Sequence, residues 1–590
     1  MRRALWRALL AATLLCAIGL LPWLSRTDPA LTVLKARSAE RDPTPEVLAA
    51  VRDELGLDAG PLKLLGEWFG GLARGDAGRS WISGAEVTPS VVQALGAPLR
   101  SAPPPRGPGA PTAAAVCART LWLGAHRRLD DRRGGGSVAA MVAALPEFLT
   151  ASVLAVVVGV HLGWLPALGW YGPQWMVLPA LALGLPAGAL LGRMLDDLLP
   201  GAFAEPWALA AAARGIPGRA TARQAVRRCV PGLLPNFGLF VVGLTGGAVT
   251  VEQIFDIPGL GRTTLQAAIA QDLPVLQAGT LALVLLAAVA GALVRLAARL
   301  LIGPALRDGA LHSLHRPKPP APRRTPLLYG AVLLSVVALG LTRDPLALDT
   351  GARLQPPSWA HPLGTDALGR DLLARIGHGA FTTLALAVTI SAAALLTGVL
   401  LGLLPRLSGP LVDTVNAIPA VLAGLLVAGV AGSGAATPAL AVAAVAWVPL
   451  AAHTTALLEQ ERATTHITAT KGLGADDAYL LRRELLPAVL PPVVRHALLR
   501  LPAVALALTS LGFLGLGAQP PDPEWGLLLA ENQPYAERAP WAVLAPAAAL
   551  ALLGALAVTA AGGVRWPSLR FARGARQPKP AVATTLGETG

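Results

Sequence analysis

Long apolar runs recur through this 590-residue chain, and they restrict its fold more than any other feature. A helix needs about 20 consecutive apolar residues to cross the roughly 30 Å hydrocarbon core of a membrane. Residues 383–404 and 542–564 reach that length. Because lipid offers no partners for backbone polar groups, only helices and closed barrels cross it, and runs this long indicate helices. The sequence therefore predicts an all-α polytopic membrane protein.

The charge composition agrees with this prediction. Charged residues make up 14% of the chain, whereas soluble proteins typically carry about 25%. The formal net charge of +14 suggests nucleic-acid binding, but the arginines cluster beside apolar runs, which the positive-inside rule explains better. No nucleic-acid partner is therefore expected. Cys16, Cys117 and Cys229 have no paired spacing, so the sequence indicates neither a disulfide framework nor a zinc site.

The apolar runs form two groups of six, which predicts two homologous six-span halves. The first group covers residues 8–24, 112–125, 138–165, 175–191, 233–251 and 275–301. The second group covers residues 326–341, 383–404, 411–430, 438–458, 488–510 and 542–564. The second run of the first group is weak, because it is short and contains Arg119, and a central arginine costs about 2.5–3.5 kcal/mol. Whether residues 97–125 cross the membrane therefore stays open at this stage.

Two polar loops of similar pattern interrupt the apolar runs, one in each half. The first reads Leu209-Ala-Ala-Ala-Ala-Arg-Gly215 and the second Thr468-Ala-Thr-Lys-Gly-Leu-Gly474. An arginine follows eight residues after each glycine, at Arg223 and Arg482. Two similar loops in two apolar halves suggest a duplicated membrane protein. Each half then presents one surface to the same kind of partner.

The second loop resembles the cytoplasmic loop motif of ABC-importer permeases, Glu-Ala-Ala-x3-Gly-x9-Ile-x-Leu-Pro. Thr468, Thr470 and Glu484 replace the usual glutamate, second alanine and isoleucine. In that family the loop forms a short coupling helix that docks on the ATPase subunit, whereas a solvated loop between spans is the simpler alternative. The resemblance implies ATPase-coupling residues in both halves, namely Ala210, Ala211, Gly215, Ala469, Gly474, Leu486 and Pro487.

Longer strings resemble the two partner permeases of dipeptide, oligopeptide and nickel importers. Val251-Glu-Gln-Ile-Phe-Asp-Ile-Pro-Gly-Leu-Gly-Arg262 is similar to the signature of one partner. His361-Pro-Leu-Gly-Thr-Asp-Ala-Leu-Gly-Arg-Asp371 is similar to the signature of the other. Since the family normally encodes its two permeases separately, the resemblance implies a fused pair. A metal site at His361, Asp366 and Asp371 is the alternative for the second string, but no second histidine lies at ligand spacing.

These features predict an order of segments along the chain. The expected segments are a first permease half at 1–303 with an extracytoplasmic region at 25–95 and a coupling loop at about 203–231, a proline-rich basic linker at 304–325, a second half at 326–564 with a coupling loop at about 459–487, and a basic tail at 565–590. The positive-inside rule places the coupling loops and both termini in the cytoplasm. Within the extracytoplasmic region, Thr44-Pro45-Glu46 predicts the start of a helix and Gly56 its end.

The chain carries no device for using ATP itself. It contains no Gly-x-x-x-x-Gly-Lys-Ser/Thr loop, and we predict neither catalytic residues nor a cofactor or bound metal. The apolar runs hold very few ionisable residues, unlike those of proton-coupled transporters. The family resemblance implies separate cytoplasmic ATPase subunits, an extracytoplasmic solute-binding protein and a peptide-like solute or nickel, carried across the cytoplasmic membrane. A twelve-span secondary transporter and a non-transporting remnant remain the alternatives.

Overall fold

The structure is a computed structural model that describes most of the chain. It describes residues 2–25, 29–38, 42–57, 60–100, 108–129, 145–307, 324–404 and 419–563, with a few single positions between these ranges. The secondary structure within these ranges is helical. It includes no strands, only two isolated β-bridges, at Arg79–Glu86 and Thr365–Asp371. The prediction of an all-α protein is therefore confirmed. The linker and tail predicted at 304–325 and 565–590 lie largely or wholly outside the described residues.

The helices of the first half run from the N-terminus to Arg307. They are α1 (Arg2–Gly19), α2 (Leu21–Leu24), α3 (Pro29–Arg37), α4 (Pro45–Glu54), α5 (Pro61–Ala73), α6 (Val87–Arg100), α7 (Gly109–Ala125), α9 (Glu147–Leu154), η2 (Ala155–His161), η3 (Pro173–Met176), α10 (Val177–Phe203), α11 (Pro206–Ala213), α12 (Gly218–Ile254), α13 (Leu260–Ala270) and α14 (Leu273–Arg307).

The helices of the second half begin after the linker. They are α15 (Thr325–Leu341), η4 (Thr350–Ala352), α16 (Leu372–Gly402), α18 (Ala420–Ala431), α19 (Ala436–Ala446), α20 (Val448–Arg462), α21 (Thr465–Gly472), α22 (Asp477–Tyr479), η5 (Leu480–Leu485), α23 (Leu486–Phe513), α24 (Trp525–Asn532), η6 (Gln533–Tyr535) and α25 (Pro540–Gly563).

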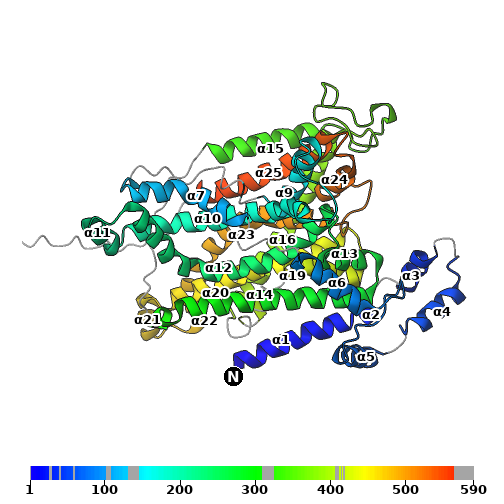
Figure 1. Ribbon diagram of the computed structural model, residues 1–590. Coiled ribbons are helices and arrows are strands. Elements are labelled where there is room, and N and C mark those ends of the chain that lie inside the picture. Colours follow the sequence, from blue (N-terminus) through cyan, green and yellow to red (C-terminus); the bar gives the residue numbers. More distant parts are fainter. Residues whose placement is uncertain are drawn as a thin grey trace, which may run out of the picture.

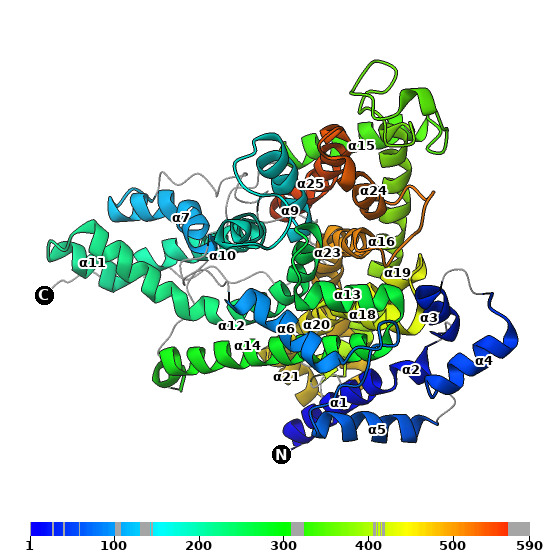
Figure 2. The same cartoon turned by 45° about the vertical axis from the view of Figure 1, so that its right-hand side comes forward.

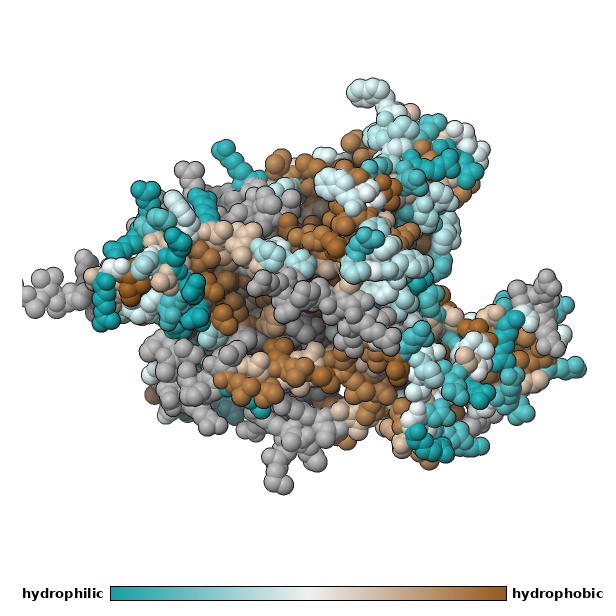
Figure 3. Space-filling view, in the orientation of Figure 1, coloured by the Kyte–Doolittle hydropathy of each residue, from teal (hydrophilic) through white to brown (hydrophobic). Residues whose placement is uncertain are grey.

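The long helices lie side by side and run between two ends of the molecule (Figure 1). The short helices α11 and α21 lie apart from each other but toward the same end, whereas α13 and α24 lie toward the other. After the roles that the sequence predicts for them, we call these the coupling end and the outer end. The turned view in Figure 2 keeps α11 and α24 far apart. Apolar side chains gather on the surface between two polar ends (Figure 3), and exposed leucines such as Leu293, Leu300 and Leu334 contribute to this belt.

Six helices in the described part of the chain are long and apolar enough to cross a membrane. They are Pro173–Phe203, Leu273–Val294, Leu372–Gly402, Ala436–Arg462, Asp477–Phe513 and Pro540–Ala557. Four further expected spans are shorter apolar helices, at Leu9–Gly19, Glu147–His161, Pro326–Leu341 and Ala420–Ala431. Helix α12 contains the expected span at 233–251. This arrangement agrees with the two homologous halves of membrane helices that the sequence predicts.

Two expected spans lie partly outside the described residues. The described helices within 138–165 and 411–430 start after Pro146 and Pro419, and each proline adopts extended backbone as the N-cap. Most of the preceding residues lie outside the described part. Proline favours this first-turn position because it lacks the amide proton that a helix interior requires. The acidic Glu147 is the first residue of α9 and lies inside the expected span at 138–165, a feature that the sequence reading overlooked.

The weak stretch at 97–125 is not one long span but two shorter helices. Helix α6 packs against α13 and α14, whereas α7 packs against α10. The α7–α10 contact is a seam of small residues, because a β-carbon on Gly188 would lie 2.3 Å from the Gly109 carbonyl oxygen. Close backbone approach of this kind stabilises helix pairs in lipid. Arg119 is exposed, and its helix is roughly 25 Å long at 1.5 Å per residue.

Both halves contribute to one continuous apolar core. Phe148 of the first half stacks on Phe513 of the second, with ring centroids 5.7 Å apart. The Gln271 side chain donates to the Ala428 carbonyl over 2.9 Å and so joins α13 to the end of α18. A glutamine that lies 4% exposed needs such a partner, because an unpaired buried amide is costly. The two halves are therefore packed into a single body.

Candidate functional site

The first polar loop folds as the short helix α11 followed by a glycine turn. The Gly215 amide donates to the Ala212 carbonyl over 3.1 Å, and the Ile216 amide donates to Ala211 over 3.0 Å. This pair of bonds is the Schellman arrangement, which closes a helix through one left-handed residue. Gly215 has φ +72°, a value that glycine adopts without steric cost. The basic run predicted as loop up to 231 is already the start of α12.

The second polar loop repeats this geometry in α21. The Gly474 amide donates to Lys471 over 3.0 Å, and the Ala475 amide donates to Thr470 over 3.3 Å. Gly474 has φ +95°. A β-carbon on either glycine would meet no atom of this chain within 4 Å. Backbone conformation therefore accounts for glycine at both positions.

The expected coupling residues lie on or near the surface at the coupling end. Ala210, Gly215, Ala469, Gly474 and Pro487 are exposed, and Ala211 and Leu486 are half-buried. Leu486 and Pro487 do not join the short helix but begin α23, directly after the wide turn η5. The side chain that packs under α21 comes instead from Leu485, which clusters with Leu458, Ile467 and Leu480.

The two short helices are anchored with unequal strength, a feature that the sequence reading missed. In the first loop, Arg228 holds Glu205 through two bonds of 2.7 and 3.0 Å, and Trp207 donates to the same carboxylate over 2.7 Å. Both charged side chains are little exposed, at 21% and 23%. In the second loop the comparable pair is Lys471–Asp477 at 3.2 Å, which is 65% and 89% exposed. The acid directly before Pro206 was the available signal, since acids favour helix N-termini.

A hollow lies beside each short helix. The first has a volume of about 330 Å³ and is lined by Arg127, which follows α7, and by residues of α11 and α12 such as Ala212 and Thr221. The second has a volume of about 710 Å³ and is lined by residues including Thr468 and Lys471. Both hollows open at the coupling end, where α11 and α21 lie (Figure 1). Each half thus presents a concave surface at this end of the molecule, and the two surfaces differ in size.

At the outer end, the first signature string folds around Glu252. Its carboxylate accepts a bond of 2.9 Å from the Arg262 amide at the start of α13. A β-carbon on Gly259 would lie 2.2 Å from the same carboxyl group. The nearby Asp272 accepts bonds from the Ser80 hydroxyl and from the Trp81 amide. These acidic residues therefore hold the outer loops against α13 and α14.

The second signature string forms a buried ion-pair network. Asp366 pairs with Arg370 at 2.7 Å and with Arg375 at 2.9 Å. Arg375 also reaches Glu531 at 2.7 Å, which joins α16 to α24. Asp371 caps α16 by accepting the Leu373 amide. Arginine side chains and backbone amides already bind these carboxylates, so the arrangement does not fit a metal site. The described residues contain no cluster of three metal-ligating side chains.

Two segments of the chain match a known protein family. Residues 125–303 and 390–563, more than half of the chain together, match the family described as binding-protein-dependent transport system inner membrane component. One match falls in each half. The break between the matches spans the linker and the outer loop that holds the second signature string.

Individual relatives match about a third of the chain. The di/tripeptide transport system permease protein of Pseudomonas aeruginosa (strain UCBPP-PA14) is 37% identical over 196 residues, which are 31% of this chain and 65% of that protein. The probable D,D-dipeptide transport system permease protein of Escherichia coli (strain K12) is 34% identical over 33% of this chain and 68% of its own length. The glutathione transport system permease protein of Pectobacterium atrosepticum is 36% identical over 30% of this chain and 61% of its own length. The chain thus matches slightly less than two thirds of the first of these relatives.

Proposed function

This chain belongs to the family of binding-protein-dependent transport system inner membrane components, and from this premise we propose that it forms the whole membrane part of an ATP-driven importer. The observation that carries the proposal is the repetition of one coupling geometry, a short helix closed by a left-handed glycine, in both halves and at one end of the molecule. A single chain then offers two equivalent docking surfaces. Two ATPase domains are the partner that such a pair of surfaces fits.

The proposed transport mechanism depends on which subunits bind and hydrolyse ATP. The sequence contains no phosphate-binding loop of the Gly-x-x-x-x-Gly-Lys-Ser/Thr type, so ATP is bound by separate cytoplasmic subunits. Closure of those subunits moves α11, which packs against the long helix α12, and α21, which packs against η5 at the start of the long helix α23. The long helices then change the side of the membrane to which the space between the halves is open. Movement of packed helices around a fixed site is a common form of such switching.

The proposed solute is a short peptide or a related small molecule. Three relatives are named for transport of di/tripeptides, D,D-dipeptides and glutathione, and these solutes share a peptide-like backbone. An extracytoplasmic binding protein delivers the solute to the outer end. Both chain termini and the coupling end then face the cytoplasm, since the basic residues of α12 and of the adjoining loops lie there.

Purification of the chain together with its ATPases tests the fused arrangement. We expect one copy of this chain for each pair of ATPase domains, because each half supplies one docking surface. Mass photometry of the complex in nanodiscs measures that ratio. Two copies of this chain per complex contradict the proposal. In proteoliposomes, ATP hydrolysis should rise when the binding protein and its peptide are added, and an unchanged rate also contradicts it.

A further inference from the structure

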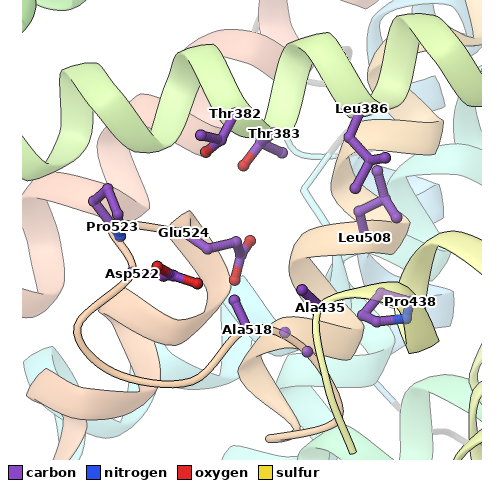
Figure 4. Close-up of a pocket in the computed structure, with 12 residues that line it drawn as sticks. Thr382, Thr383, Leu386, Ala435, Pro438, Leu508, Ala518, Asp522, Pro523 and Glu524 are labelled. Atoms are coloured by element: carbon purple, nitrogen blue, oxygen red, sulfur yellow. The ribbon is translucent and has the colours of Figure 1, made fainter. Parts of the chain in front are cut away.

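A small pocket lies in the second half between α16, α19, α23 and the loop before α24 (Figure 4). Its volume is about 250 Å³. The walls are mostly apolar and include Leu386, Pro438 and Leu508. Pro438 lies in the first turn of α19 and Leu508 near the end of α23, so the pocket lies toward the outer end. Exposed residues at its edge, such as Asp522, show where it opens.

A buried hydroxyl without a partner points into this pocket. Thr383 is 3% exposed, and its Oγ1 atom has no hydrogen-bond partner in the described part of the structure. Other threonines of the same helix behave differently, since Thr382, Thr389 and Thr397 donate to carbonyls three or four residues earlier. Figure 4 shows the Thr383 hydroxyl turned away from its helix toward Glu524. A buried unpaired hydroxyl is costly, so its orientation toward the pocket indicates a ligand.

The opposite wall of the pocket carries a carboxylate that has no cationic partner among the described residues. Glu524 caps α24 and accepts bonds of 2.9 and 2.8 Å from the Gly526 and Leu527 amides. Burial raises the pKa of Glu524 to about 7, against the opposing effect of these two bonds. A carboxylate accepts more than two hydrogen bonds, so it retains capacity toward the cavity. A cationic group bound in the pocket would neutralise the negative charge of the Glu524 carboxylate.

We propose that this pocket binds a protonated primary amine attached to a short apolar group, as at the N-terminus of a peptide with a hydrophobic first residue. The ammonium group donates to Glu524 and Thr383, while the apolar group lies against Leu386, Pro438 and Leu508. Asp522 at the mouth attracts the positive charge. The inference rests on the proposed function. It adds that the permease itself recognises the ammonium group of the solute.

A metal ion fits the same pocket less well. Hard cations such as Ca²⁺ require six or more oxygen ligands. The pocket offers the carboxylates of Asp522 and Glu524 and the hydroxyls of two threonines between apolar walls. An ammonium group needs only three acceptors. An amine with an apolar substituent therefore fits both the polar and the apolar parts of the lining.

Direct binding to the full chain in nanodiscs tests the proposal. The probe is leucyl-leucine, and its N-acetylated form is the matched ligand without the ammonium charge. We expect Glu524→Gln to weaken leucyl-leucine binding about tenfold or more, since a hydrogen bond to a charged group contributes about 1.5–3 kcal/mol. The single oxygen of the glutamine amide still accepts one of the two cap bonds, so α24 keeps part of its cap. Thr383→Val should weaken binding severalfold. Thr389→Val, an exposed threonine on the same helix, should not change it.

The pH dependence gives a second readout. Glu524 is neutral below its pKa of about 7, so binding should fall as the pH is lowered through 7, and Glu524→Gln should remove that fall. Asp522 is the other titratable residue that lines the pocket, and α16, α19 and α23 contribute no charged side chain to the lining. The peptide α-amine loses its charge above about pH 8. Maximal binding is therefore expected between these limits.

Equal binding of leucyl-leucine and its N-acetylated form would overturn the proposal, as would no detectable binding or unchanged affinity in both pocket variants. These outcomes are separable from failure of the importer function. If Glu524→Gln and Thr383→Val bind as wild type while the complex with its ATPases still transports peptide, the pocket assignment fails and the importer function survives. If the complex shows no binding-protein-stimulated hydrolysis at all, the importer function itself fails.

Discussion

At the scale of single residues, the signature strings of this chain are mainly local structural devices. Gly215 and Gly474 occur where the backbone enters the left-handed region at the end of a short helix. Asp366 and Glu531 neutralise the fully buried Arg375. Removing one member of such a buried network leaves the other charges unpaired, which is strongly destabilising. The spacing within each string therefore reflects the geometry of a turn or an ion pair.

The glycine turns lead to a prediction about coupling. Replacing Gly474 with leucine should strain α21 by about 1–3 kcal/mol, because a branched residue at positive φ is unfavourable. We expect the protein to be produced normally while ATP hydrolysis becomes uncoupled from uptake. Gly215→Leu should act likewise, whereas asparagine at either position should be milder, since it tolerates left-handed backbone. The assay compares hydrolysis with uptake in proteoliposomes.

The matched control for these variants is Gly472→Ala. Gly472 lies within α21, its φ is not positive, and a β-carbon there meets no atom within 4 Å. Alanine at this position should leave coupling intact. Wild-type coupling in both leucine variants would show that the glycine turns do not transmit the movement.

At the scale of elements, the two halves use the same helix with different supports. Helix α11 is tied to α12 by the partly buried Glu205–Arg228 pair. Helix α21 depends mainly on apolar packing of Ile467, because its ion pairs are exposed. Exposed pairs contribute little because water and salt screen them, whereas bidentate, partly buried pairs contribute more. The first coupling helix should therefore be the more rigidly attached of the two.

This difference can be measured by amide hydrogen exchange. Arg228→Met should lower the local stability of α11 by about 1–2 kcal/mol, which speeds exchange of its amides by roughly 5–30-fold. Lys471→Met should leave exchange in α21 unchanged. The double variant Glu205→Gln with Arg228→Met should lower the local stability of α11 no more than Arg228→Met alone, because both changes remove the same interaction. Equal effects of Arg228→Met and Lys471→Met would contradict the inferred asymmetry.

At the scale of the whole molecule, the chain is one body with two chemically different ends. The halves share an apolar core through contacts such as Phe148–Phe513. The coupling helices lie at one end and the signature loops toward the other (Figure 1). Between them, α6 near the outer end and α7 beside α10 together take the place of one long span. The topology therefore depends on whether the chain crosses the membrane between the start of α6 and the end of α7.

Cysteine labelling in intact cells tests that crossing. The native cysteines are first replaced by serine, and single cysteines are introduced at the exposed positions Ser83 and His126. A membrane-impermeant thiol reagent should label position 83 and leave position 126 unlabelled until the membrane is opened. Thr465→Cys on α21 serves as the control for the coupling end and should also stay unlabelled. Labelling at both 83 and 126 would mean that the crossing is absent.

The sequence by itself determined the fold class and the positions of most of the apolar helices. The length of an apolar run decides what can cross lipid, and positive φ at a helix end favours glycine. Both signals come from neighbouring residues and can therefore be recognised in the sequence. The helix predicted from Thr44 to Gly56 is confirmed for the same reason, since the Thr44 hydroxyl accepts the Val47 amide and Gly56 has φ +63°. Caps and turns depend on residues only a few positions apart.

Only the tertiary structure decided the features that join distant residues. Glu205 and Arg228 are 23 positions apart, and Arg375 and Glu531 are 156 apart, so no local pattern predicts either pair. The weak stretch around Arg119 could not be interpreted from hydropathy, because its support comes from Gly188 on another helix. The unpaired Thr383 hydroxyl is likewise invisible in the sequence. Hydrophobicity is a property of one segment, whereas a partner for a buried charge or hydroxyl exists only after the segments have packed.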